Sequence, residues 1–190
     1  MFHTRHGRVL AGLSSLALVS GLGACSAQPG VALQVGDTTY SEADVTQAVD
    51  QYDQMFGQDP GRSDFVAALA NAHHILEMGT DHGIVVDDAT VDTQIEAAKE
   101  QQTITDVPDH INHALMDLLR MQLTVSELQA KVSDTQQLSD ELAQKQVQAD
   151  LHVNPRYGTL DENNQIVPTT FGDVVSGGSS AGTDSSQSGN

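Results

Sequence analysis

The sequence predicts a mainly α-helical domain of about five helices with a small β-hairpin at its start. Between positions 45 and 147, apolar residues recur every three or four positions, which is the spacing of helices with one buried face. Before them, Val31–Val35 alternates in polarity, and Gly36-Asp37 forms a two-residue turn signal ahead of Thr38–Tyr40. With 190 residues, the chain has room for one modest domain and its ends.

The first helix has clear signals at both ends. The hydroxyl of Ser41 can cap its start, and Asp44 lies three residues later, where a carboxylate suits the positive helix end. Gly57 and the turn Asp59-Pro60-Gly61 end it. One face of this helix is predicted to be buried, and it carries Val45, Ala48, Val49, Tyr52 and Phe56.

The second and third helices are joined by a short apolar connector. The second helix begins at Ser63 or Asp64, and Gly79 is placed to end it. Gly83-Ile84-Val85-Val86 then leads to a third helix capped by Asp87 or Asp88. The predicted apolar positions of these two helices are Phe65, Leu69, Ala72, Leu76, Val91, Ile95 and Ala98.

The last part of the body contains two more helices and a strand. Asp106 and Pro108 are predicted to open a fourth, strongly apolar helix. A fifth, polar helix lies between Ser133 and Asp150, and Leu151–Val153 is typical of a short strand. After Pro168 the composition becomes rich in Gly and Ser, which predicts a folded body over residues 31–168 and a disordered tail over 169–190.

The N-terminus is typical of an export signal. Arg5 and Arg8 precede an uncharged apolar run from Val9 to Gly21, which is shorter than the stretch of about 20 residues that spans a bilayer. The following Leu22-Gly-Ala-Cys25 resembles a bacterial lipobox. We therefore expect a signal peptide over residues 1–24, diacylglycerol thioether formation and possible N-acylation at Cys25, and a tether over 25–30. The alternative for Cys25, a small buried side chain, is disfavoured by its position.

Charge and cysteine content exclude several classes of protein. The chain has 26 Asp and Glu against 8 Lys and Arg, a formal net charge of −18. This excludes nucleic acid as a partner, because phosphate backbones are bound through basic side chains. A single cysteine also excludes a disulfide scaffold and a zinc ribbon.

No constellation of side chains indicates catalysis, so we expect no enzymatic activity, no cofactor and no metal. His110 and His113 have a spacing that could place two imidazoles on one helix face, but no further ligand is set by the sequence. We therefore interpret them as solvated side chains. The segment from Asp161 begins like a calcium loop, but Ile166 and Gly172 occupy its sixth and twelfth positions.

Three segments carry a resemblance to a known family. They are Val35–Val45 at the entry to the first helix, His82–Asp92 at the link to the third helix, and Asp150–Gly158, which contains Val-Asn-Pro-Arg-Tyr-Gly. In this order they resemble the N-terminal chaperone domain of the SurA and PrsA foldases, of the trigger-factor-like group. The resemblance implies a helical cradle that holds unfolded secreted proteins. We expect the parvulin domain of these foldases to be missing, since it needs on the order of 100 residues and residues 154–190 are too few.

The leading functional hypothesis is a lipid-anchored, ATP-independent holdase on the extracytoplasmic face of the cell membrane. Its partners would be unfolded secreted or envelope proteins, contacted through the fourth helix. The alternative is a non-catalytic adaptor lipoprotein that binds one defined envelope protein. The candidate client contacts are Leu115, Met116, Leu119 and Met121, although an apolar stripe of this kind can equally be core.

Overall fold

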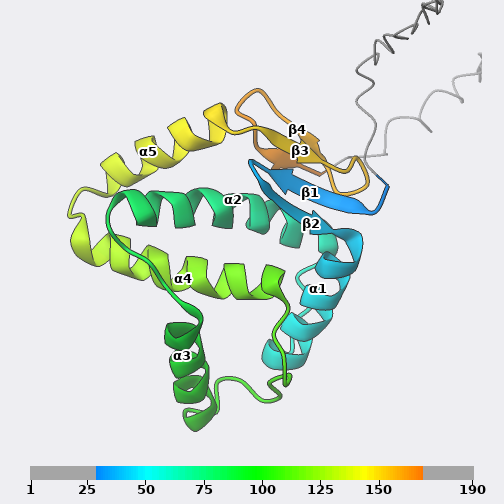
Figure 1. Cartoon of the computed structure of the whole chain (residues 1–190), viewed down its shortest axis with the longest axis vertical. Helices are drawn as coiled ribbons and strands as arrows, with labels where there is room; N and C mark the ends of the chain where they lie inside the picture. The colour runs from blue at the N-terminus through cyan, green and yellow to red at the C-terminus, as the bar shows by residue number, and fades with distance from the viewer. Residues whose placement is uncertain (1–28, 169–190) are drawn as a thin grey trace, which may run out of the picture.

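In the computed structural model, residues 29–168 are described, and they form five helices and five short strands. The mainly α-helical prediction with a small β element is confirmed. Figure 1 shows α2 and α4 side by side, with the hairpin and α1 at one end, α5 against α2, and α3 beside α4. The elements are β1 (Val31–Val35), β2 (Thr38–Ser41), α1 (Glu42–Phe56), α2 (Arg62–Asp81), α3 (Asp88–Glu100), α4 (His113–Lys131), α5 (Thr135–Gln148), β3 (Leu151–Val153), β4 (Thr159–Leu160) and β5 (Ile166–Val167).

The predicted hairpin forms and gains a third strand from the far end of the domain. β1 lies between β2 and β3 and is antiparallel to both, with Val35 opposite Thr38 on one side and Leu151 on the other. The short strand predicted at 151–153 is therefore confirmed. β4 and β5 form a separate two-stranded ribbon. The sheet joins the start of the described chain to its last third.

The first helix has the predicted ends. The Asp44 amide donates to the Ser41 hydroxyl at 3.0 Å, and the Ser41 amide donates to the Asp44 carboxylate at 2.9 Å, which completes a reciprocal capping box. At the other end, Gly57 adopts a left-handed conformation with φ of 66°, and its amide donates to the carbonyl of Asp53 at 2.7 Å. Local sequence signals were sufficient here because both caps lie within four residues of the groups they satisfy.

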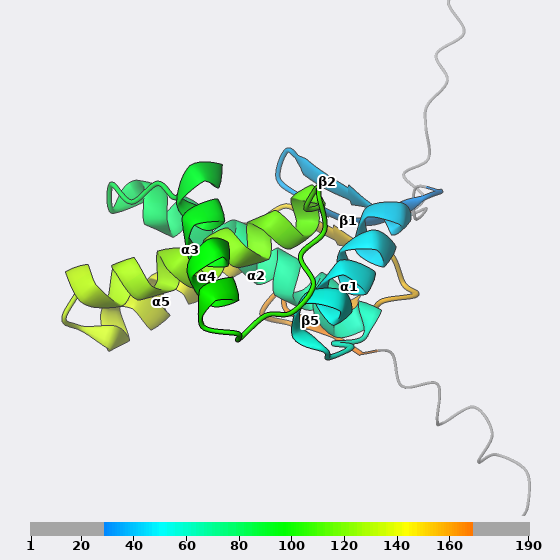
Figure 2. The same ribbon diagram turned by 90° about the horizontal axis from the view of Figure 1, so that it is seen from below.

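The core lies where the hairpin, α1, α2 and α4 meet. Figure 2 shows the hairpin and α1 at one end of the molecule and α5 at the other. Tyr40, Phe65 and Leu115 are among its largest buried side chains. α5 contributes no buried residue, in agreement with its predicted polar character. Burial of α1, α2, α4 and the hairpin therefore supplies most of the hydrophobic stabilisation, and α5 adds little.

The predicted end of the second helix at Gly79 is wrong. α2 continues to Asp81, and the left-handed turn is made instead by Gly83, with φ of 69°. Gly79 is buried inside the helix, and a Cβ atom added there would lie 2.4 Å from the Cγ2 of Thr124 in α4. A glycine is needed here because of a close approach between two helices, which the local sequence does not reveal.

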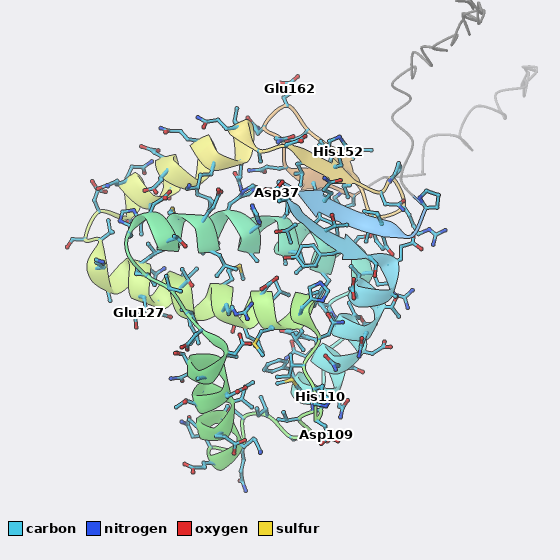
Figure 3. All side chains as sticks on the ribbon, in the orientation of Figure 1. Asp37, Asp109, His110, Glu127, His152 and Glu162 are labelled. Carbon is cyan, nitrogen blue, oxygen red and sulfur yellow. The ribbon has the colours of Figure 1, made fainter. Side chains whose placement is uncertain are left out.

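The predicted start of the fourth helix is also wrong. α4 begins at His113, and Asn112 caps it by accepting from the Ala114 amide at 2.8 Å. The preceding loop is held by the buried side chain of Gln51 in α1, which donates to the His110 carbonyl and accepts from the Asn112 amide, both at 2.7 Å. These hydrogen bonds from Gln51 satisfy backbone groups of the loop, which would otherwise be paired within an extra helical turn before His113. His110 consequently lies in the loop, and does not share a helix face with His113 (Figure 3).

Several predictions concern residues outside the described part of the chain. They are the signal peptide over 1–24, lipidation at Cys25, most of the tether over 25–30, and the tail over 169–190. Among the helices of residues 29–168, none has the length and apolar character needed to cross a membrane.

Candidate binding groove

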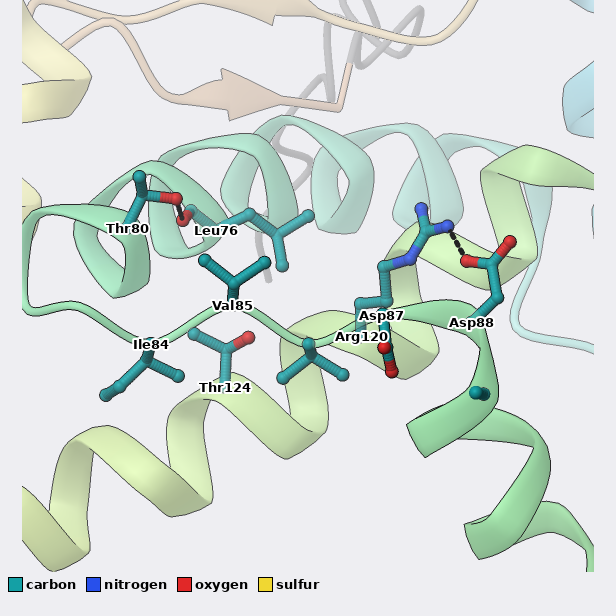
Figure 4. A pocket seen from close by; sticks show the side chains of 10 residues that line it. Leu76, Thr80, Ile84, Val85, Asp87, Asp88, Arg120 and Thr124 are labelled. Carbon is teal, nitrogen blue, oxygen red and sulfur yellow. Dashed lines mark hydrogen bonds and ion pairs between the residues drawn. The ribbon is translucent and has the colours of Figure 1, made fainter.

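A groove of about 640 Å³ lies between α2, α4 and the segment that joins α2 to α3 (Figure 4). We call the segment 82–87 the connector and the hollow beside it the connector groove. Its lining is made up of equal numbers of aliphatic and of polar or charged side chains. These residues are Leu76, Thr80, Ile84, Val85, Val86, Asp87, Asp88, Ala89, Arg120 and Thr124.

Helix geometry explains how two walls of the groove are formed. Leu76 and Thr80 lie one turn apart on α2, as do Arg120 and Thr124 on α4, so each pair faces the same side of its helix. The close approach of Gly79 to Thr124 brings the two helices together below them. Thr124 therefore both contacts α2 at this crossing and lines the groove.

The connector is fixed at its start. The Gly83 amide donates to the Thr80 carbonyl at 2.9 Å, and the Ile84 amide donates to the Gly79 carbonyl at 2.7 Å. The ammonium group of Lys131 donates to the His82 carbonyl, and the His82 ring lies 2.9 Å from the carboxylate of Glu141 in α5. The connector therefore leaves α2 along a defined path.

Past Ile84 the connector is exposed to solvent. The side chain of Val85 is 79% exposed, whereas Val86 is partly buried against the core. Within residues 29–168, no group forms a hydrogen bond with the backbone amide or carbonyl of either valine. Two β-branched residues, Val85 and Val86, whose backbone groups have no partner within residues 29–168, therefore border the connector groove.

The one basic side chain at the groove, Arg120, is already paired with carboxylates. Arg120 donates to Asp117 at 2.6 Å and to Asp88 in α3, and Figure 4 marks the second of these contacts. Asp117 also accepts from the Tyr40 hydroxyl at 2.8 Å. Burial, with the neighbouring Asp117 carboxylate, raises the pKa of Tyr40 above its ordinary range. Since two carboxylates occupy the Arg120 guanidinium, this cation is not available as an anion site.

Two buried polar atoms have no partner within the described residues, the Thr124 hydroxyl and the Nδ1 of His74. Thr124 lines the connector groove. His74 lines a second cavity of about 140 Å³ between α2, α5 and the β4–β5 ribbon, with Asn71 and Gln146 beside it. Burial lowers the pKa of His74 below its ordinary value of 6.5. His74 is therefore neutral at physiological pH.

The predicted client contacts on α4 do not form one accessible surface. Leu115 is 0% exposed and belongs to the core, so it is inaccessible to a client in this conformation. Met116, Leu119 and Met121 are partly buried and pack against the core. The alternative that the stripe is core therefore holds for Leu115.

The sequence did not identify the connector groove as a site. Its only signal was the apolar run Gly83–Val86, which was interpreted as a link between helices. The contributions of Thr80, Arg120 and Thr124 could not be predicted, because they depend on how α2 and α4 pack together. A groove between non-adjacent elements has no periodic signature of its own.

The acidic and histidine side chains of the described residues do not converge on a metal site. No group of three or more His, Cys, Asp or Glu side chains in residues 29–168 is arranged to hold a metal ion. Figure 3 shows Asp37, Glu127 and Glu162 on separate elements, and all three are exposed.

Comparisons with protein-family models, with curated proteins and with solved structures gave no match.

Proposed function

We propose that this protein is a lipid-anchored, ATP-independent holdase for secreted or envelope proteins, acting on the extracytoplasmic side of the cell membrane. Two features support the proposal. The lipobox-like Leu22–Cys25 follows a basic and apolar start. The connector groove supplies an aliphatic hollow open to solvent, with Val85 79% exposed at its edge. The proposed holding role rests on this groove. It replaces the α4 surface around Leu115 as the proposed contact site for clients.

The size of the groove suits transient binding. Burying one aliphatic side chain of a client contributes roughly 1.5–3 kcal/mol, and ordering the client opposes part of this. A few such contacts allow rapid release without an energy source. A lipid tether at Cys25 would raise the local concentration of the groove near newly exported chains, compensating for weak affinity.

The test is suppression of client aggregation by the chain from residue 25 onward with Cys25→Ala, measured by light scattering of a chemically unfolded protein. We expect Val85→Lys to reduce suppression, because it places a charge at the groove. Val147→Lys is the matched control, since Val147 is 60% exposed on α5 and does not line the groove. No suppression at several-fold molar excess, or equal loss in both variants, would contradict the proposal.

A specific observation favours a second candidate, an adaptor lipoprotein that binds one envelope protein. Within residues 29–168 the exposed large hydrophobic side chains are Val85, Val147, Leu160 and Val167, a small set for binding many clients. Cross-linking in intact cells distinguishes the two candidates. Many unrelated proteins captured through position 85 indicate a holdase, whereas one abundant protein indicates an adaptor. Cys25→Ala should reduce capture in either case.

A further inference from the structure

We propose that the connector binds a client as an added β-strand: an extended, basic-flanked segment pairs its backbone with one edge of the connector, at Val85 or Val86, and places alternate apolar side chains in the connector groove. This inference rests on the proposed holdase function and specifies how the groove would bind and which segments it would select. It follows from three properties of the connector.

The first property is a backbone without hydrogen bonds that runs into an extended residue, Asp87. Neither Val85 nor Val86 has a backbone hydrogen bond within residues 29–168, and Asp87 is extended, with φ of −90° and ψ of 171°. Such an edge is a template for another strand. The helices on both sides anchor the connector, because Ile84 is bonded to α2 and Asp87 caps α3 through the Thr90 amide at 2.9 Å. A client therefore meets a preorganised edge.

The second property is the aliphatic hollow beside this edge. In a strand, every second side chain points to the same face. A segment paired with the connector would direct alternate side chains toward Leu76, Ile84 and Ala89. Ile84–Asp87 spans roughly 13 Å at about 3.3 Å per residue, which matches a client segment of about four to six residues. The groove would thus select alternating sequences with small or β-branched apolar residues.

The third property is the sign of the charge. Asp87 and Asp88 lie on the groove, and Arg120, the one basic side chain in its lining, is paired with two carboxylates. Over the whole chain, acidic residues outnumber basic ones by 26 to 8. A segment flanked by Lys or Arg is attracted to this surface, whereas one flanked by Glu is repelled.

The probe is a fluorescein-labelled heptapeptide in which three valines alternate with two threonines between terminal lysines. Two further versions carry N-methyl groups on either the valine or the threonine amides. Because successive amides of a strand point to opposite edges, only one version blocks pairing with the connector. Fluorescence anisotropy with the Cys25→Ala chain from residue 25 should show about tenfold weaker binding for one methylated version and little change for the other.

The same protein serves to test the preference for basic flanking residues and the location of the bound peptide. A glutamate-flanked peptide should bind more weakly than the lysine-flanked one, and added salt should reduce the difference. Hydrogen exchange followed by NMR should show that the lysine-flanked peptide protects the amide of Val85 or Val86. An unchanged exchange rate at both amides on saturation with peptide would overturn the inference.

The remaining outcomes separate this inference from the proposed function. Equal binding of both methylated peptides, or no peptide binding while client aggregation is still suppressed, would overturn strand addition alone. Loss of both peptide binding and suppression would overturn the holdase as well. Protection of Val85 or Val86 without peptide also overturns the inference: it assigns the groove to the chain's own tail if deletion of 169–190 removes it, and to a second copy if dilution does.

Discussion

The helices at the two ends of this domain, α1 and α5, differ in how much of their surface is buried. At the hairpin end, α1 buries five residues, and its Gln51 also holds the loop before α4. At the connector end, α5 buries none, and the connector leaves a groove between α2 and α4. The difference shows that a covering layer of sheet and helix seals the core at one end, whereas the connector leaves a groove open beside α2 and α4. The proposed client site would therefore lie away from the most densely packed end of the molecule.

The largest expected effect lies at the hairpin end, at Leu115. We expect Leu115→Ala to lower the free energy of unfolding by about 2–5 kcal/mol, because it leaves a cavity in a fully buried site. Leu138→Ala on α5 is the matched control and should cost much less, since that helix buries no residue. Urea denaturation followed by circular dichroism measures both. Equal losses would remove the distinction between the two ends.

A smaller effect is expected where α2 crosses α4 below the groove. Gly79→Ala places a methyl group 2.4 Å from the Thr124 Cγ2, so we expect a net loss of about 1–3 kcal/mol in unfolding free energy, although alanine favours helices. Thr124→Ser removes that methyl group and should rescue much of the loss. A double-mutant cycle by urea denaturation measures the coupling. If the changes in unfolding free energy of the two substitutions simply add, the helices separate easily at this crossing.

The contrast between the ends also explains what the sequence predicted. The hairpin and both ends of α1 were predicted because their signals are local: the Gly36-Asp37 turn, Ser41 with Asp44, and Gly57. The roles of Gly79 and of the loop before α4 were not, because they depend on Thr124 and Gln51, which are distant in sequence. The groove depends on such distant packing along its whole length. Leu115 shows the same limit of sequence-based prediction. The periodicity of apolar residues identifies the apolar face of a helix, but not whether that face packs against the core or contacts a partner.

The next prediction tests the second cavity, where α5 covers α2. His74 is buried, and this lowers its pKa despite the nearby Glu77, while His73 and Lys145 lower it further. The unfolded chain therefore binds this proton more readily. The contribution of His74 to stability should be complete above pH 6.5 and decline as the pH falls through the window between 6.5 and its lowered folded-state pKa.

Unfolding free energy measured against pH provides the test. His74→Gln should flatten the decline below pH 6.5, whereas His152→Gln should leave it unchanged, because the side chain of His152 is 70% exposed. A parallel decline in both variants would show that α5 opens enough to hydrate the cavity.

The smallest expected effect concerns how α3 is held beside the groove. The Arg120–Asp88 pair joins α4 to α3, but the Asp88 side chain is 66% exposed, so the pair should contribute less than about 1 kcal/mol. A cycle of Asp88→Asn, Arg120→Gln and the double variant isolates this coupling from the effect of Asp88 on the α3 dipole and of Arg120 on Asp117. Amide exchange in α3 provides the local readout.

We expect a small coupling that weakens with salt and appears as modestly faster exchange across α3. Glu96→Gln is the control, because its partner Lys99 lies in the same helix and does not reach α4. If the cycle gives no coupling, α3 is held by its buried Val91 and Ile95 alone. The position of α3 beside the connector would then depend on apolar packing and not on this ion pair.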